Sequence, residues 1–316
     1  MVNDPKQQDR IVEHSRKMIR DGSKSFAGAA RLLPTTVRES VYMLYAWCRY
    51  CDDQIDAQYL GHGIPCPKGS AETLARLEAQ TRAALAGEAV DEPVFIALQR
   101  VIRRHAIPER HAFELLRGFK MDVDGRRFNT LEDSLDYCYH VAGVVGVMMA
   151  HLMDAREQEA LDRAADLGIA LQMTNIARDV MDDAEAGRIY LPLDWLQEAA
   201  IPVDEIANRE HRKRLHEVTR RYLETAELYY ESARYGLSWL DPRCAWAIAS
   251  ARGIYREIGR QVLDRGATAW DTRTVVGPTK KVLRALSASV DAALAVGLRR
   301  QRQDQPSSRK GLWTRP

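Results

Sequence analysis

Two stretches of this chain each place two aspartates and two other polar residues on one side of a helix. In the first stretch the spacing is 0, 4, 7 and 11 residues, over Tyr45, Arg49, Asp52 and Asp56. In the second stretch it is 0, 3, 7 and 11 residues, over Gln172, Asn175, Asp179 and Asp183. At about 100° per residue, each set forms one stripe along a helix. Each stripe therefore presents two carboxylates one helical turn apart.

Carboxylates paired in this way suit the binding of hard divalent cations. Two carboxylates at positions i and i+4 repel each other, and burying them together is unfavourable unless cations compensate. Their oxygen atoms suit Mg2+, which keeps several waters and shares a diphosphate. We predict a Mg2+ site, with Mn2+ as the alternative ion, formed by Asp52, Asp56, Asn175, Asp179 and Asp183. Such a site would turn a bound diphosphate into a better leaving group, with added positive charge from Arg49, Arg178 and Arg188.

The alternative is that these acids line solvated helix faces, which is the usual role of a single D-x-x-x-D motif. Two features favour the metal site instead. The stripes adjoin polar and aromatic residues, whereas a surface helix carries alternating Glu and Lys. The two stripes also agree with each other in length and in order.

The elements that carry these stripes are predicted to be helices, as is most of the chain. Helical periodicity, punctuated by Pro and Gly, recurs in segments of about 10 to 35 residues. Ser70 is expected to start a helix that ends near Gly87, and Thr130 with Asp133 resembles a capping box. Further helices are expected over residues 37–59, capped by Thr35 or Thr36, from Pro93, from Pro108, and over 130–151, 157–184, 204–240, 241–265 and 278–302.

Composition and charge narrow the class of protein. Hydrophobic residues make up 46% of the 316 residues and charged residues 28%, which is typical of a globular protein. The net charge of +2 gives no indication of nucleic acid as a partner. The first 20 residues lack the apolar region of a signal peptide. The longest apolar run, Val141 to Met153, is shorter than the roughly 20 residues of a membrane span. We therefore expect a cytoplasmic protein.

Four motifs resemble those of the squalene and phytoene synthase family. They are SKSF at Ser23–Phe26, YAWCRYCDDQID at Tyr45–Asp56, YCYHVAGVVGVMM at Tyr137–Met149 and LQMTNIARDVMDDAEAGRIYLP at Leu171–Pro192. The similarity covers about residues 12–300, and the GRIYLP ending is most similar to bacterial members. The resemblance implies an all-α, single-domain isoprenoid synthase fold around a central apolar cavity. We expect a catalytic domain over 1–300 and a polar, basic, mobile tail over 301–316.

The resemblance also implies a reaction. Two geranylgeranyl diphosphates would condense head to head, through prephytoene diphosphate, to phytoene in carotenoid biosynthesis. This is the activity of a prenyltransferase, and no NADPH is expected. One alternative within the family is a squalene or dehydrosqualene synthase that uses farnesyl diphosphate. The alternative from another class is a non-catalytic assembly factor with the same fold, although its Asp motifs should have decayed.

Carried over to this sequence, the family's site residues fall into three groups. The resemblance assigns catalysis to Asp52, Asp56, Asp179, Asp183, Arg49 and Tyr137, the tyrosine lying near the reacting carbons. It assigns diphosphate binding or closure of the site to Ser23, Ser25, Phe26, Tyr45, Gln172, Asn175, Arg178, Tyr255 and Arg273. It assigns the cavity wall to Val141, Ala142, Val145 and Gly146, although close packing of helices explains these small residues equally well.

The expected partners follow from a substrate and product that are long and apolar. They are geranylgeranyl diphosphate itself and a downstream carotenoid desaturase that receives the product. Loose attachment to the inner face of the membrane is the open alternative to a purely cytoplasmic position. Either the basic tail or an apolar cavity mouth would provide that attachment.

Overall fold

The computed structural model describes residues 5–56, 70–298 and 309–316. Within these ranges every regular element is helical, which confirms the all-α prediction. The long helices are α1 (Pro5–Gly22), α3 (Thr35–Asp56), α9 (Gln158–Glu185), α11 (Arg212–Gly236), α12 (Pro242–Arg265) and α13 (Pro278–Leu298). The shorter ones are α2 (Lys24–Ala30), α4 (Ala71–Ala86), α5 (Pro93–His105), α6 (Arg110–Val123), α7 (Leu131–Cys138), α8 (Val144–Leu152) and α10 (Leu193–Glu198). None of these helices combines the length and the hydropathy needed to cross a bilayer.

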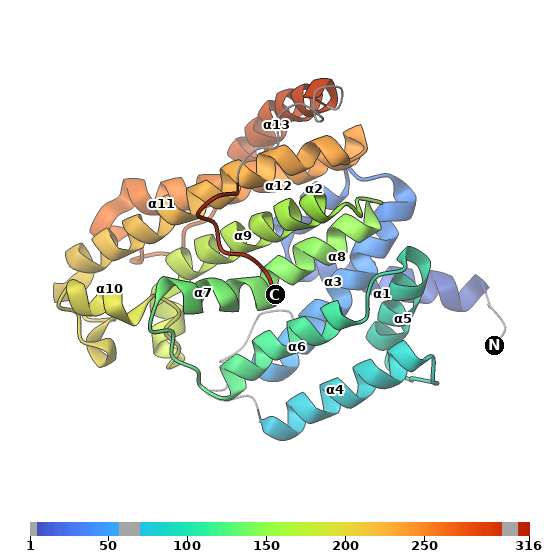
Figure 1. Ribbon diagram of the computed structural model, residues 1–316, viewed down its shortest axis with the longest axis horizontal. Helices are drawn as coiled ribbons and strands as arrows, with labels where there is room; N and C mark the ends of the chain where they lie inside the picture. Colours follow the sequence, from blue (N-terminus) through green and yellow to red (C-terminus); the bar gives the residue numbers. More distant parts are fainter. Residues whose placement is uncertain (1–4, 57–69, 299–308) are drawn as a thin grey trace.

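The helices surround α9, which lies at the centre of the molecule (Figure 1). α9 packs against α8, α11 and α12, whereas α3 packs against α1 and α5. α13 lies outside α12, farther from the centre than the other helices of that side (Figure 1). α3 and α9, which carry the two stripes, therefore pack mainly against other helices, and a cavity can lie between them.

Local sequence sets several helix boundaries as predicted. The Ser70 hydroxyl accepts a hydrogen bond from the Thr73 amide at the start of α4, which ends at Gly87 with φ of 83°. A non-glycine residue is disfavoured at such a φ. At α7 the Thr130 and Asp133 side chains form the reciprocal capping box. These contacts satisfy amide groups that would otherwise lack partners.

One predicted helix, over residues 204–240, is shorter than expected. α11 begins only at Arg212, and short 3-10 turns cover Val203–Glu205 and Arg209–His211. The Asn208 side chain accepts a hydrogen bond from the Glu210 amide at 3.2 Å. Asparagine competes in this way with helical hydrogen bonding, which explains the break.

The small residues predicted for the cavity wall also allow two helices to approach closely. A π-helical turn, Tyr139–Gly143, joins α7 to α8, and turns of this kind are frequent at functional sites. A Cβ atom on Gly146 would lie 2.2 Å from the Ala164 carbonyl oxygen, and one on Gly168 would lie 2.2 Å from that of Ala142. Close packing against α9 is therefore one reason for glycine here.

The structure of the C-terminal segment differs from the mobile tail that was predicted. Residues 301–308 lie outside the described residues, but 309–316 pack against the body of the protein. The Arg309 guanidinium donates to both oxygens of Asp166, at 2.6 and 2.9 Å. The Trp313 ring lies 5.3 Å from the Tyr139 ring, and Arg315 pairs with Asp162 at 2.7 Å. An ion pair that joins α9 to the last residues thus replaces the expected free end.

A buried glutamate attaches α13 to α12. The Glu257 carboxylate accepts hydrogen bonds from Lys280, at 2.8 Å, and from Arg284. Burial alone raises the pKa of Glu257, but these hydrogen bonds and one from Gln261 lower it to about 2. The folded pKa is therefore below the usual 4.5. Its stabilising contribution is complete above about pH 4.5 and is lost as the pH falls towards about 2.

We expect α13 to loosen in acid before the rest of the protein does. Protonation of Glu257 removes the carboxylate that holds Lys280 and Arg284. As the pH falls below about 4.5, the α13 amides should therefore exchange their hydrogens faster than the α9 amides do. The comparison is made after correction for intrinsic exchange rates. Glu257→Gln should show the same acceleration at neutral pH. Identical protection of α13 in this variant and in the wild type would contradict the attachment.

Candidate active site in a central cavity

One cavity of about 580 Å3 lies between α3, α6, α8, α9 and α12. Its volume is in the range of sites that enclose a small molecule. Seventeen of the predicted site residues line it: Phe26, Tyr45, Arg49, Asp52, Asp56, Tyr137, Val141, Ala142, Val145, Gly146, Gln172, Asn175, Arg178, Asp179, Asp183, Tyr255 and Arg273. The wall away from the acids is apolar, with residues such as Leu33, Met149 and Leu240. The cavity therefore combines a cluster of charged residues with a lining that is otherwise mostly apolar.

The two acidic stripes meet at the same cavity. Asp52 and Asp56 come from α3, and Asp179 and Asp183 come from α9. Arg188, just after α9, pairs with Asp56 at 2.6 Å and so connects the two helices. This ion pair brings the stripes to one region, although they are more than one hundred residues apart in the sequence.

Arginines surround the aspartates. Arg49 donates to Asp52 at 2.6 Å, and Asp179 accepts hydrogen bonds from Arg178 and, at 3.1 Å, from Arg273. The region therefore holds acidic groups for cations and basic groups for an anion side by side. Such a combination suits a diphosphate that is bound together with metal ions.

The carboxylates perturb one another. Burial, followed by the charge of Asp179, raises the pKa of Asp183 well above its usual range. Burial also raises the pKa of Asp52, with Asp56 adding to the effect and Arg49 opposing it. Enclosed carboxylates that repel each other in this way gain stability from a divalent cation.

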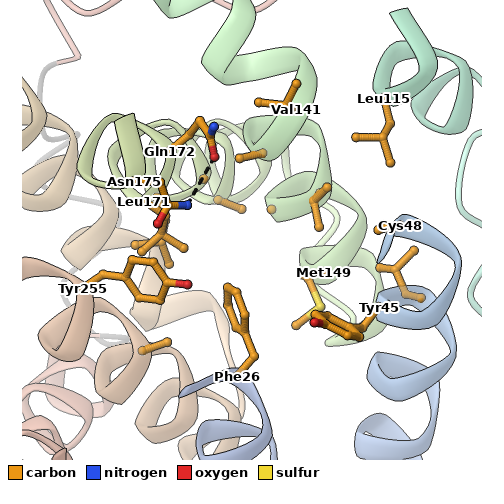
Figure 2. A pocket seen from close by; sticks show the side chains of 18 of the residues that line it. Phe26, Tyr45, Cys48, Leu115, Val141, Met149, Leu171, Gln172, Asn175 and Tyr255 are labelled. Atoms are coloured by element: carbon orange, nitrogen blue, oxygen red, sulfur yellow. Dashed lines mark hydrogen bonds between the residues drawn. The ribbon is translucent and has the colours of Figure 1, made fainter. Parts of the chain in front are cut away.

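The donors fit Mg2+ chemically. Four aspartates are accompanied by the amide groups of Gln172 and Asn175, which contact each other at 3.3 Å (Figure 2). The aspartates do not form a compact cage, because the one trio of acidic or histidine ligand atoms within 4.8 Å in the described ranges is Glu205, Glu210 and His211, outside this cavity. Open spacing of this kind suits ions that share a substrate diphosphate and retain water.

Three aromatic side chains from different helices face the cavity together. Phe26, on α2, lies between Tyr45 of α3 and Tyr255 of α12 (Figure 2). The Phe26 ring centre is 6.4 Å from that of Tyr45 and 5.5 Å from that of Tyr255. The Tyr45 hydroxyl is buried close to Arg49. These rings would shield a bound chain from water and present their faces to a positive charge.

Of the two predicted serines, Ser23 is described and is not among the residues that line this cavity. The Ser23 hydroxyl accepts a hydrogen bond from the Phe26 amide at 3.3 Å and so caps α2. This contact positions the helix that carries Phe26. The side chain of Ser25 lies outside the described part of the structure.

A further acid of this cavity, Asp122 of α6, was not identified from the sequence. Its carboxylate accepts hydrogen bonds from the hydroxyls of Tyr137, at 3.0 Å, and Tyr190, at 2.7 Å. The two tyrosine rings stack with their centres 4.6 Å apart. Burial raises the pKa of Asp122 to about 6, opposed chiefly by Arg188. Leu115, Phe119 and Asp122 line the cavity at offsets 0, 4 and 7, which is a helical face with one acid among apolar residues and therefore gives only a weak sequence signal.

Asp122 is expected to act by positioning the two tyrosines. In Asp122→Asn the side-chain shape is kept, but both hydroxyls lose the charged acceptor and one of them faces an amide NH2 that cannot accept a hydrogen bond. This costs about 1.5 to 3 kcal/mol. We expect turnover to fall about 10- to 100-fold, with a melting temperature that is lower by only a few degrees. Asp124→Asn, an exposed aspartate two residues away that pairs with Lys120, is the matched control. Equal turnover in the two variants would contradict the assignment.

Comparison with known proteins agrees with these features. The model of the Squalene/phytoene synthase family matches residues 19–280. The chain is 48% identical to a 15-cis-phytoene synthase of Enterobacter agglomerans, over 93% of this chain and 99% of the relative. It is 46% identical to a phytoene synthase of Pseudescherichia vulneris, over 98% and 99% of the two chains.

Solved structures show the same fold. A dehydrosqualene synthase crystallised with a ligand is 30% identical, with a TM-score of 0.82 over 91% of this chain and 98% of that one. A squalene synthase from Alicyclobacillus acidocaldarius is 26% identical, with a TM-score of 0.70 over 81% and 94%. The expected isoprenoid synthase fold is confirmed. By its family model, its relatives and its fold, this chain belongs to the squalene/phytoene synthase family.

Proposed function

We propose that this prenyltransferase joins two geranylgeranyl diphosphates head to head to form phytoene, a step of carotenoid biosynthesis. The main support is that both acidic stripes border one largely apolar cavity. The chain is also nearly half identical, over almost its whole length, to bacterial proteins named 15-cis-phytoene synthase. An aspartate-rich region for diphosphate beside an apolar region for prenyl chains fits this substrate.

The proposed reaction has two ionisation steps. In the first, the C–O bond of one substrate breaks, and diphosphate leaves with the electron pair to give an allylic cation. The double bond of the second substrate attacks this cation, and proton loss closes the cyclopropane ring of prephytoene diphosphate. The second diphosphate then leaves, the carbon skeleton rearranges, and loss of another proton gives phytoene. No hydride is consumed, and we infer that no NADPH takes part.

The residues of the charged region hold the leaving group. Arg49, Arg178, Arg188 and Arg273 place positive charge beside the aspartates. Metal ions bound by Asp52, Asp56, Asn175, Asp179 and Asp183 would neutralise the charge that develops on diphosphate. Mg2+ is the proposed ion and Mn2+ the alternative. The released diphosphate is the proposed proton acceptor.

The apolar region protects the cations from water, which would otherwise quench them. Val141, Ala142, Val145 and Gly146 form part of its wall. Phe26, Tyr45 and Tyr255 lie near its charged end, and the stacked rings of Tyr137 and Tyr190 border it from another side. Aromatic faces attract positive charge, so these rings are the proposed stabilisers of the carbocations.

Product identification tests this function. The purified protein is incubated with Mg2+ and either geranylgeranyl or farnesyl diphosphate, and the extracted hydrocarbon is identified by mass spectrometry. We expect forty-carbon phytoene from the first substrate. A thirty-carbon product alone would instead favour the activity of a dehydrosqualene synthase, the enzyme named for one of the similar solved structures. Formation of neither product would favour the non-catalytic alternative.

Removal of divalent ions should abolish turnover. Chelation with EDTA is expected to lower product formation by at least about two orders of magnitude, because charge on the leaving group is no longer neutralised. Excess Mg2+ should restore the activity, and Mn2+ should restore it in part. Full activity after exhaustive chelation and dialysis would contradict the metal assignment.

We further infer a cytoplasmic enzyme that is loosely attached to the inner face of the membrane. Its substrate has a long prenyl tail, and its product is a hydrocarbon that water does not dissolve. A downstream carotenoid desaturase would receive that product from the bilayer. The catalytic domain is proposed to cover residues 1–300.

A further inference from the structure

The outward face of α13 is made of large aliphatic side chains. Between 51% and 62% of the surface of each residue is exposed, and they are Val282, Leu283, Leu286, Val290 and Leu294. At about 100° per residue these five positions fall within roughly 120° of each other on the helix. We call them the aliphatic stripe. Among the described residues, it contains five of the eight exposed large hydrophobic side chains.

The inward face of α13 consists of small residues. Ala288, Ala292 and Ala295 are buried, and the Trp246 indole of α12 donates to the Ala285 carbonyl at 2.7 Å. A helix that packs on a core normally turns its large apolar side chains inward. α13 reverses this arrangement. A continuous exposed apolar patch of this kind marks a contact with another phase or partner.

The stripe continues towards the charged end of the cavity. Val275, which is 67% exposed, lies just before α13 and two residues after Arg273. Arg273 lines the cavity and contacts Asp179 at 3.1 Å. Lys280, which remains exposed although its ammonium group contacts Glu257 at 2.8 Å, and the neighbouring Lys281 border the stripe near the same end. An apolar surface with basic residues at one end therefore begins beside the diphosphate region.

We propose that the aliphatic stripe and Val275 form the surface that docks on a lipid bilayer. The stripe would lie in the boundary between headgroups and acyl chains, and the lysines would lie among the phosphates. The charged end of the cavity would then face the headgroups, where the diphosphate of a membrane-borne prenyl lipid lies. This inference rests on the proposed function, because it takes the substrate to be such a lipid.

A second copy of the chain fits this surface less well. Five partly exposed aliphatic side chains form a patch on the order of a few hundred Å2, whereas a stable dimer buries about 800 Å2 per partner. The stripe belongs to one helix at the outside of the fold (Figure 1). It carries no charged side chain that would specify a protein partner. A bilayer needs neither a large area nor a specific partner group.

The experiment is flotation of the full chain with vesicles of phosphatidylcholine and phosphatidylglycerol, without substrate. The wild type should float with the vesicles. In the variant Leu283→Ser/Leu286→Ser/Val290→Ser the partition coefficient onto the vesicles should fall by at least about tenfold. Leu228→Ser, which replaces a leucine of α11 that is 59% exposed, should bind as the wild type does. Circular dichroism and melting curves verify folding, and Val282→Ser/Leu294→Ser provides an independent second variant.

Three outcomes would overturn the proposal. They are a wild type that does not float, stripe variants that float as the wild type does, and a wild-type dimer that the stripe variants convert to a monomer. A turnover assay with geranylgeranyl diphosphate dispersed in detergent distinguishes this proposal from the proposed function. In that assay, which contains no bilayer, the stripe variants should retain wild-type turnover. Flotation without any phytoene synthesis would reject the function and leave the docking surface standing.

Discussion

Asp179→Ala is expected to lower turnover by at least two to three orders of magnitude while the helical content stays unchanged. The Asp179 carboxylate has two arginine partners, Arg178 and Arg273, and it faces the same cavity as the α3 stripe. Without it the second stripe keeps a single aspartate, and the leaving diphosphate loses metal-borne charge neutralisation. Asp52→Ala should have an effect of the same order from the opposite helix.

The aspartate variants should lose turnover without losing thermal stability. Because the charge of Asp179 adds to burial in raising the pKa of Asp183, removing Asp179 relieves repulsion in the metal-free protein. We expect the melting temperature of Asp179→Ala in EDTA to equal or exceed that of the wild type, the usual relation between stability and a charged active site. Single-turnover product formation and thermal melting provide the two measurements.

The matched control is Asp264→Ala, an exposed aspartate of α12 that does not line the cavity. It should retain both turnover and melting temperature. Wild-type turnover in both Asp52→Ala and Asp179→Ala would remove the metal assignment altogether. Loss of turnover together with a collapsed melting temperature would mean that the carboxylates support the fold and not the chemistry.

The acidic stripes were readable from the sequence because each depends on the periodicity of a single helix. Offsets of 4, 7 and 11 fix which side chains share a face, whatever the helix packs against. Asp122 escaped notice because its α6 stripe holds one acid among apolar residues, and only the fold brings Tyr137 and Tyr190 to it. The site therefore divides into helix-local features, which spacing predicts, and contacts between helices, which spacing cannot predict.

The same distinction applies to the fold. Ser70, Gly87 and the Thr130–Asp133 box act within a few residues of the helix ends that they define, so their effects follow from local chemistry. The packing of residues 309–316 depends on Asp166, which is 143 residues away from Arg309. In the sequence that segment is polar and basic, and nothing within it indicates a buried partner.

Arg309→Ala should destabilise the protein more than any surface substitution. Asp166 is fully buried, and in the described residues its carboxylate accepts hydrogen bonds from Arg309 and from Ser232. Removing the guanidinium leaves a buried charge without its counter-ion, which costs about 3 to 5 kcal/mol. The midpoint of urea unfolding should fall accordingly, with an unchanged m-value. Lys310→Ala removes the same charge at the adjacent exposed position and should change the midpoint little.

A rescue experiment distinguishes this ion pair from a general role of the C-terminal residues. Asp166→Asn in the Arg309→Ala background removes the uncompensated charge and should recover much of the lost stability, since a neutral amide is less costly to bury than a carboxylate. Absence of any recovery would indicate that the segment acts through the packing of Trp313 on Tyr139. Because α9 carries both Asp166 and Asp179, the last eight residues stabilise the same helix that presents the second metal-binding stripe.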